Sequence, residues 1–218
     1  MCPANYEGMI PHVDDNVVYL PPEDYLTEED SYNNDKFYVL LHEFAHLLQF
    51  SEEECQTHDV YGSPVRKMFN CVPMVEGFAE WASVKVAKDK GLTKIIKQVR
   101  LNHSGNKIPA DMETYFSNDW VNDMGGFGDG IRTDRPYACG YAFSVYIAET
   151  YGDNIFGKIF TEGLDDKYWW DYNGGLTTKE NQIEESKLHV EAIKAVTSQT
   201  VFKDFDEWYP KNKNKLYK

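Results

Sequence analysis

The stretch from Lys36 to Phe50 reads KFYVLLHEFAHLLQF, and the interpretation of the whole chain starts from it. Its apolar residues recur every three or four positions, which is the spacing of one buried helix face. They are Phe37, Leu40, Leu41, Phe44, Leu47 and Leu48. Asn33, Asn34 and Asp35 stand just before this stretch and are suitable N-cap residues. The pattern therefore predicts a helix from about Lys36 to Phe50.

Two histidines of this predicted helix are spaced for metal binding. His42 and His46 are four positions apart, so their imidazoles lie on one face, one turn from each other. Glu43 follows the first histidine, and its carboxylate can reach a water on the ion without being a ligand, as a general base requires. The alternative is that this HExxH pattern arises by chance and that the histidines are packed or solvated.

A second helix is predicted from Pro73 to Lys90, with Gly91 as its stop. It contains the segment VEGFAEW, in which Glu76 and Glu80 lie one turn apart among apolar residues. Carboxylates on an apolar face are costly unless they are paired or metal-bound. A catalytic zinc normally takes three protein ligands, so this helix can supply the third. The alternative is a solvent-facing acidic pair.

Taken together, HEFAH and the later EGFAEW resemble the gluzincin metallopeptidases. The resemblance implies that Glu76 is the third zinc ligand and that Glu80 is an outer carboxylate bonded to a zinc-binding histidine. Farther along, the segment DRPYACGYAF resembles the part of the family in which a tyrosine shortly before a glycine donates a hydrogen bond to the oxyanion. By that pattern the donor is Tyr137.

The residues around this tyrosine support the same role. Pro136 suits the first position of a helix, so Tyr137 falls in the first turn, where the helix dipole favours negative charge nearby. Gly140 is unfavourable inside a helix, which indicates close packing on that face. Tyr141, one turn farther along, is the competing candidate, and ordinary aromatic packing is the alternative for both tyrosines.

An early strand region followed by helices indicates an α+β domain, and the resemblance implies one of the thermolysin-like, gluzincin type. It consists of a small N-terminal sheet with the HExxH helix, followed by a mainly helical C-terminal lobe. We expect one catalytic domain over residues 1–218, with an upper lobe of about 1–90 and a lower lobe of about 91–218. Periodicity predicts a short strand at Asn16–Leu20, a loop at 51–70 and further helices at 93–100, 136–150, 154–161, 180–196 and 202–208.

The function that follows is that of a zinc-dependent metallopeptidase, in which Zn²⁺ activates a water for attack on a peptide bond and Glu43 is the general base. The chain lacks the GxMEN-type segment with which aminopeptidase-like members hold a substrate N-terminus, so an endopeptidase is expected. Two alternatives remain: a non-catalytic binding module that keeps the gluzincin fold, and a zinc hydrolase of a non-peptide amide.

The expected activity implies a protein or peptide substrate, and composition argues against two other kinds of partner. The net charge of -14 argues against a nucleic-acid backbone as partner. No apolar run reaches the roughly 20 residues of a membrane-spanning helix. The sequence leaves the oligomeric state open.

The cysteines and the remaining histidines lead to further predictions about a disulfide, export and solvent exposure. Cys55 and Cys71 form either a disulfide of an exported protein or two inert thiols. We expect a secreted or cell-surface protein, with a signal that this sequence does not contain. Isolated in polar or turn-like contexts, the other histidines are expected to be solvated: His12, His58, His103 and His189.

Overall fold

The computed structural model describes residues 12–14, 17–19, 33–50, 55–58, 64–66, 71–103, 105–123, 134–163 and 178–216. Most of these residues are helical. The helices are α1 (Asn33–Phe50), α2 (Val72–Asp89), α3 (Thr93–His103), α4 (Met112–Thr114), the π-helix η2 (Tyr115–Asp119), α5 (Trp120–Asp123), α6 (Arg135–Tyr151), α7 (Ile155–Gly163), α8 (Lys179–Val196) and α9 (Val201–Asn212). All seven helices predicted from periodicity are confirmed, whereas the segment from α4 to α5 was not anticipated.

The expected α+β class is wrong, because this is a helical fold. The strands are β1 (His12–Asp14), β2 (Val17–Tyr19), β3 (Cys55–His58) and β4 (Pro64–Arg66). They pair only as two separate antiparallel hairpins, β1 with β2 and β3 with β4. A lone two-stranded hairpin is at best marginally stable and cannot form a layer of a core. The second hairpin also lies within the segment that the sequence predicts to be a loop.

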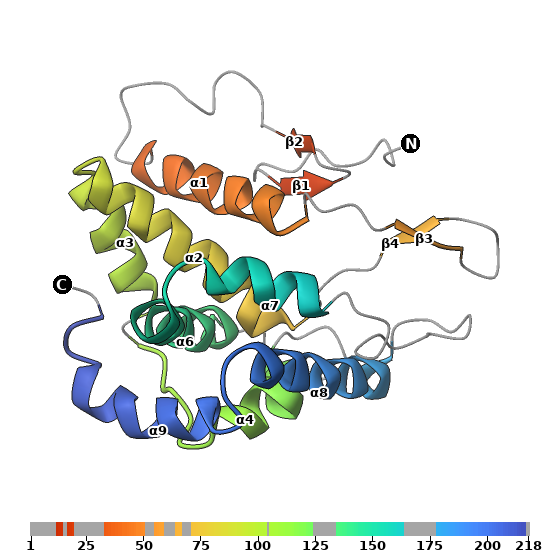
Figure 1. Ribbon diagram of the computed structural model, residues 1–218. Coiled ribbons are helices and arrows are strands. Elements are labelled where there is room, and N and C mark those ends of the chain that lie inside the picture. The colour runs from red at the N-terminus through yellow and green to blue at the C-terminus, as the bar shows by residue number, and fades with distance from the viewer. Residues whose placement is uncertain are drawn as a thin grey trace.

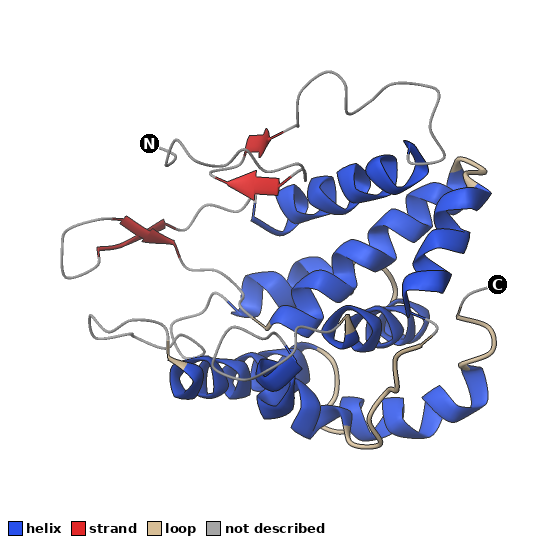
Figure 2. Ribbon diagram, turned by 180° about the vertical axis from the view of Figure 1, so that it is seen from behind, coloured by secondary structure: helices blue, strands red, loops and turns tan. Residues whose placement is uncertain are grey.

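Helix α1 lies between the β1–β2 hairpin and α2, as Figure 1 shows, and α2 in turn packs most extensively against α6. Helix α3 contacts both α1 and α2. The reverse view in Figure 2 shows the same stacking of helices, with the short strands at one margin. The contact between α2 and α6 crosses residue 90, where the sequence places the boundary between two lobes; that division stays a prediction.

Helices α2 and α6 touch through their backbones at two glycines. A Cβ atom added to Gly77 would overlap the backbone of Gly140, and one added to Gly140 would overlap the carbonyl of Pro73. The close packing expected at Gly140 is therefore observed, and its partner is α2. This contact also sets the position of the first turn of α6, which carries Tyr137, relative to Glu76.

Aromatic rings fill the core on the other side of α6. Phe143 stacks on Phe202 of α9 with ring centroids 4.8 Å apart, and Phe116 of η2 packs against both rings. Burying each such ring stabilises the fold by about 1.5–3 kcal/mol relative to an exposed ring. No helix in the described ranges has a stretch long and apolar enough to cross a bilayer.

Candidate metal centre

Three side chains from two helices converge at the contact between α1 and α2. His42 and His46 come from α1 and Glu76 from α2, and one donor atom of each lies within 4.8 Å of the others. Both histidines are 7% exposed. The spacing along each helix accounts for this arrangement, since residues four apart share a face and α2 packs on that face. The group could hold a metal ion.

The distances within the cluster fit one small ion. Glu76 Oε2 lies 2.9 Å from His42 Nε2 and 3.5 Å from His46 Nε2. Donor atoms bound to one tetrahedral zinc ion are roughly 3.3 Å apart, because each bond is about 2.0–2.1 Å long. Two imidazoles and one carboxylate are also a donor set that catalytic zinc uses.

A hydrogen-bond chain fixes the orientation of the His46 ring. The side-chain amide of Gln49 donates to the carbonyl of Val75 over 2.8 Å, which leaves Gln49 Oε1 as an acceptor. His46 Nδ1 lies 2.5 Å from that oxygen and therefore carries the proton. The other nitrogen, Nε2, lies on the side of Glu76, 3.5 Å from its Oε2. Metal-binding histidines are commonly held by an acceptor in this way.

His42 is held by a buried carboxylate on its other side. Its Nδ1 lies 3.3 Å from Oε1 of Glu80, which is only 3% exposed. Glu80 thus occupies the position that the resemblance assigns to an outer carboxylate. Because Nδ1 faces Glu80, Nε2 of His42 points toward Glu76. An ion bound between His42 and Glu76 would require this orientation.

Electrostatics of the cluster favour charged carboxylates. Burial lowers the pKa of His42, but hydrogen bonds to Glu76 and Glu80 outweigh it and raise that pKa to about 10. Burial raises the pKa of Glu76, whereas its hydrogen bonds to His42 and His46 lower it to about 2. For Glu80, burial likewise raises the pKa, but the hydrogen bond to His42 and the nearby charges outweigh it, so the pKa lies below its ordinary value. At neutral pH the two carboxylates are therefore charged and His42 is protonated, so a metal ion bound here would replace the His42 proton.

Glu43 and Tyr137 are the two residues that the sequence predicts to take part in the chemistry. Glu43 is half-buried on α1, next to His42. Tyr137 is half-buried in the first turn of α6, and its ring centroid lies 6.1 Å from that of His42. The contact between Gly77 and Gly140 explains this placement, because it brings α6 against the helix that carries Glu76.

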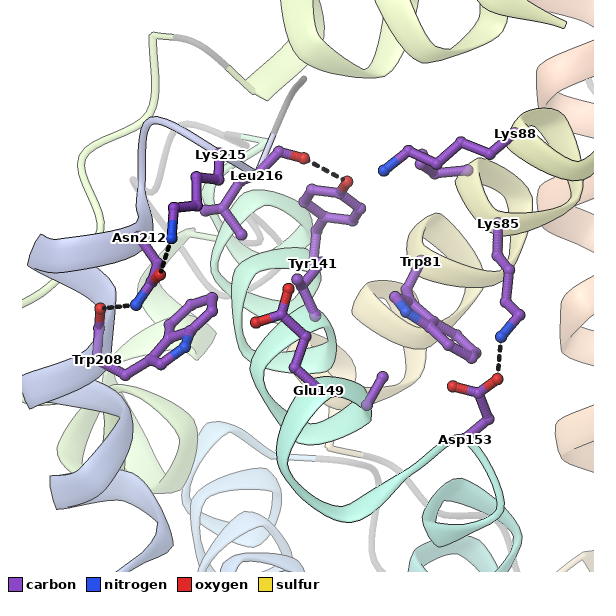
Figure 3. A pocket seen from close by; sticks show the side chains of 13 residues that line it. Trp81, Lys85, Lys88, Tyr141, Glu149, Asp153, Trp208, Asn212, Lys215 and Leu216 are labelled. Atoms are coloured by element: carbon purple, nitrogen blue, oxygen red, sulfur yellow. Dashed lines mark hydrogen bonds and ion pairs between the residues drawn. The ribbon is translucent and has the colours of Figure 1, made fainter. Parts of the chain in front are cut away.

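Tyr141, the competing tyrosine, points elsewhere. Its ring is buried, and its hydroxyl donates to the carbonyl of Leu216 over 3.0 Å (Figure 3). It lines a pocket of about 280 Å³ whose walls include Trp81 and Trp208 but none of the three donor residues. Of the two candidates, the structure therefore brings Tyr137 rather than Tyr141 beside His42.

Two histidines were misplaced by the sequence analysis. His103 is 3% exposed and His189 is completely buried, so the expectation that both are solvated is wrong. His103 belongs to the same stripe of α3 as Ile95 and Val99, which are also buried, and this four-residue spacing was the available signal. The side chains of His12 and His58 lie outside the described residues.

Cys71 is a free, buried thiol just before α2, where its Sγ lies 4.0 Å from the carbonyl oxygen of Phe116. Burial raises its pKa to about 12, so the thiol is protonated and unreactive at neutral pH. Of the two alternatives for Cys55 and Cys71, the disulfide is therefore not what the structure contains, and the side chain of Cys55 lies outside the described residues. The free thiol of Cys71 therefore gives no support to the expected export.

Comparison with known proteins found no matching family model, no matching curated protein and no matching solved structure.

Proposed function

We propose that this protein is a zinc-dependent metallopeptidase that cleaves peptide bonds as an endopeptidase. The observation that carries the proposal is the buried cluster of His42, His46 and Glu76, in which Nε2 of each histidine faces the carboxylate. An adventitious acidic surface would not explain two imidazoles whose Nδ1 atoms both face separate acceptors, Gln49 and Glu80.

His42, His46 and Glu76 would hold the zinc, and three protein ligands leave a position for water. A zinc ion bound there supplies a Lewis acid that makes water nucleophilic at neutral pH and polarises the scissile carbonyl. Glu43 then takes a proton from the attacking water and passes it to the leaving amine. Tyr137 donates a hydrogen bond to the oxygen of the former carbonyl, on which negative charge develops.

The decisive experiment combines metal analysis with a peptide library. The purified protein is assayed for bound metals by elemental analysis, and a proteome-derived peptide library is incubated with it, with and without a chelator. We expect about one zinc per chain and internal cleavages that the chelator abolishes and added zinc restores. Glu43→Gln is the matched control, because it removes the base and leaves the three ligands intact.

Blocked peptides distinguish endopeptidase from exopeptidase action. A peptide that is acetylated at its N-terminus and amidated at its C-terminus should remain a substrate of an endopeptidase. If only free termini are trimmed, the endopeptidase assignment fails. Bound zinc without any peptide cleavage would contradict the enzyme proposal and favour a binding module that retains the metal.

A further inference from the structure

Glu80 lies between two histidines that come from different helices. Its Oε1 is 3.3 Å from Nδ1 of His42 on α1, and its Oε2 is 3.5 Å from Nε2 of His103 at the end of α3. The side chains of His42, Glu80 and His103 therefore form a row that leads from the proposed zinc site into the protein interior. Helix α3 packs against both α1 and α2, so all three helices that meet here contribute one member.

This row is buried along its whole length. Glu80 and His103 are each 3% exposed. A buried carboxylate is costly unless its oxygens accept hydrogen bonds, and Oε2 of Glu80 has no partner that satisfies ordinary hydrogen-bond geometry. His103 Nε2, at 3.5 Å, needs only a small shift to become such a donor.

Charge supports this reading of His103. Burial lowers its pKa, although the nearby Glu80 and Asp134 act in the opposite direction. His103 is therefore a neutral ring at neutral pH, with a single N–H that it can donate to Glu80. The ring of Tyr141 lies beside it, with centroids 5.5 Å apart, and restricts its rotation.

We infer that His103 is a positioning residue of the proposed zinc site, because it holds the Glu80 carboxylate against Nδ1 of His42. The inference rests on the proposed function, since it concerns the orientation of a zinc ligand. Without the His103 ring, Glu80 would keep Tyr38 and His42 as neighbouring hydrogen-bonding groups but would be held less firmly, so it would direct Nε2 of His42 toward Glu76 less well. A histidine that only fills space on α3 would have no such effect.

The test compares zinc affinity in matched variants, measured by competition with a chromogenic chelator. We expect His103→Leu to weaken zinc binding by about 10-fold or more, as losses outside the ligand shell commonly do. His103→Gln keeps an N–H donor and should lose less than about threefold. His189→Leu is the control, because it removes an equally buried histidine from α8, and it should leave zinc affinity unchanged.

A double variant separates positioning from packing. If His103 acts through Glu80, His103→Leu should weaken zinc binding by less than about twofold when Glu80→Gln is already present. The absorption spectrum of the cobalt-substituted protein gives an independent readout, because its d–d bands report ligand geometry. They should shift in His103→Leu and stay as in the wild type in His189→Leu.

Three outcomes overturn the inference. One is wild-type zinc affinity in His103→Leu, and another is an equal loss with and without Glu80→Gln. Either of these leaves the zinc site itself intact. The third is a wild-type protein that binds no zinc, which overturns the proposed function as well. Thermal unfolding of each variant confirms that the measured protein is folded.

Discussion

Nε2 of His42 lies 2.9 Å from Oε2 of Glu76, although the two residues are 34 positions apart in the chain. The packing of α1 on α2 creates this contact, and both side chains depend on it electrostatically. The pKa of His42 is raised to about 10 and that of Glu76 is lowered to about 2, each against the effect of burial. When a chelator has removed any metal, the free energy of unfolding should therefore vary with pH as His42 and Glu76 titrate.

The signs of the two shifts define the pH window. The contribution of Glu76 is present above its ordinary pKa of 4.5 and is lost as pH falls toward about 2. The contribution of His42 is complete below 6.5 and is lost as pH rises toward about 10. We expect the difference in free energy of unfolding between wild type and Glu76→Gln, measured with urea and chelator, to be greatest between these ordinary values, 4.5 and 6.5. A difference that does not vary with pH would contradict the ion pair.

Glu43→Gln tests the assignment of the general base. Because Glu43 is not one of the three donors, the variant should keep its zinc and its melting temperature. Its kcat should fall by about 100-fold or more, as expected for loss of a general base. Zinc content by elemental analysis and turnover of a cleaved library peptide give the two readouts. Loss of zinc would show that Glu43 has been given the wrong role.

Glu76→Ala should behave differently from Glu43→Gln, because it removes a proposed ligand. It should lose zinc, and its activity should fall as a consequence. If the proposed site binds zinc, the ion at about 1,000 times its Kd should stabilise the wild type by about 4 kcal/mol, which corresponds to a rise in Tm of roughly 8–16 °C. The variant should show no such rise when zinc is added after chelator treatment. If it keeps both zinc and activity, the third ligand is another residue.

Tyr137→Phe and Tyr141→Phe differ by one hydroxyl each and form a matched pair. Tyr137 lies beside His42, so its variant should lose about 10- to 1,000-fold in kcat with zinc content and KM nearly unchanged. Tyr141→Phe removes a buried hydrogen bond to Leu216, so it should lower stability by about 1 kcal/mol with little effect on kcat. Exchange of these two behaviours would assign the oxyanion contact to Tyr141.

Gly140→Ala tests the contact between α2 and α6. The added methyl group would overlap the carbonyl of Pro73, so α6 must move away and we expect a loss of about 3 kcal/mol or more, together with lower turnover. Gly157→Ala is the control on α7, because its Cβ would contact nothing, and it should stabilise the protein by about 0.5–1 kcal/mol. The free energy of unfolding of each variant is measured with urea. Similar changes in Gly140→Ala and Gly157→Ala would contradict the close backbone contact.

Helices could be predicted from the sequence because their apolar spacing is regular, and α1, α2, α6 and α8 all illustrate this. The π-helical turn Tyr115–Asp119 was missed, since its extra residue per turn disturbs that spacing. The fold class was wrong for a different reason. The predicted strand at Asn16–Leu20 was taken to belong to a small sheet, whereas among the described residues the strand Val17–Tyr19 pairs only with His12–Asp14 and forms no layer of the core.

At the candidate site, local spacing brought His42 and His46 together correctly, and the EG dipeptide identified Glu76. Sequence could not place His103, because it reaches Glu80 only through the packing of α3 on α2. The choice of Tyr137 over Tyr141 came from the resemblance and from its place in the first turn, since residues four apart share a helix face and spacing alone does not separate them. The hydroxyl of Tyr141 donates to the carbonyl of Leu216, a contact between residues 75 positions apart that spacing along the helix cannot predict.

The glycine contact also determines which parts of the site can move relative to each other. Glu76 and Tyr137 belong to helices whose backbones touch at Gly77 and Gly140, so we expect them to move together as one rigid unit. His42 and His46 belong to α1, which meets that unit through side chains. An opening motion of the site would therefore take place between α1 and the rigid unit. An ion bound by His42, His46 and Glu76 would cross-link the two moving parts, so its release and the separation of α1 would be a single event.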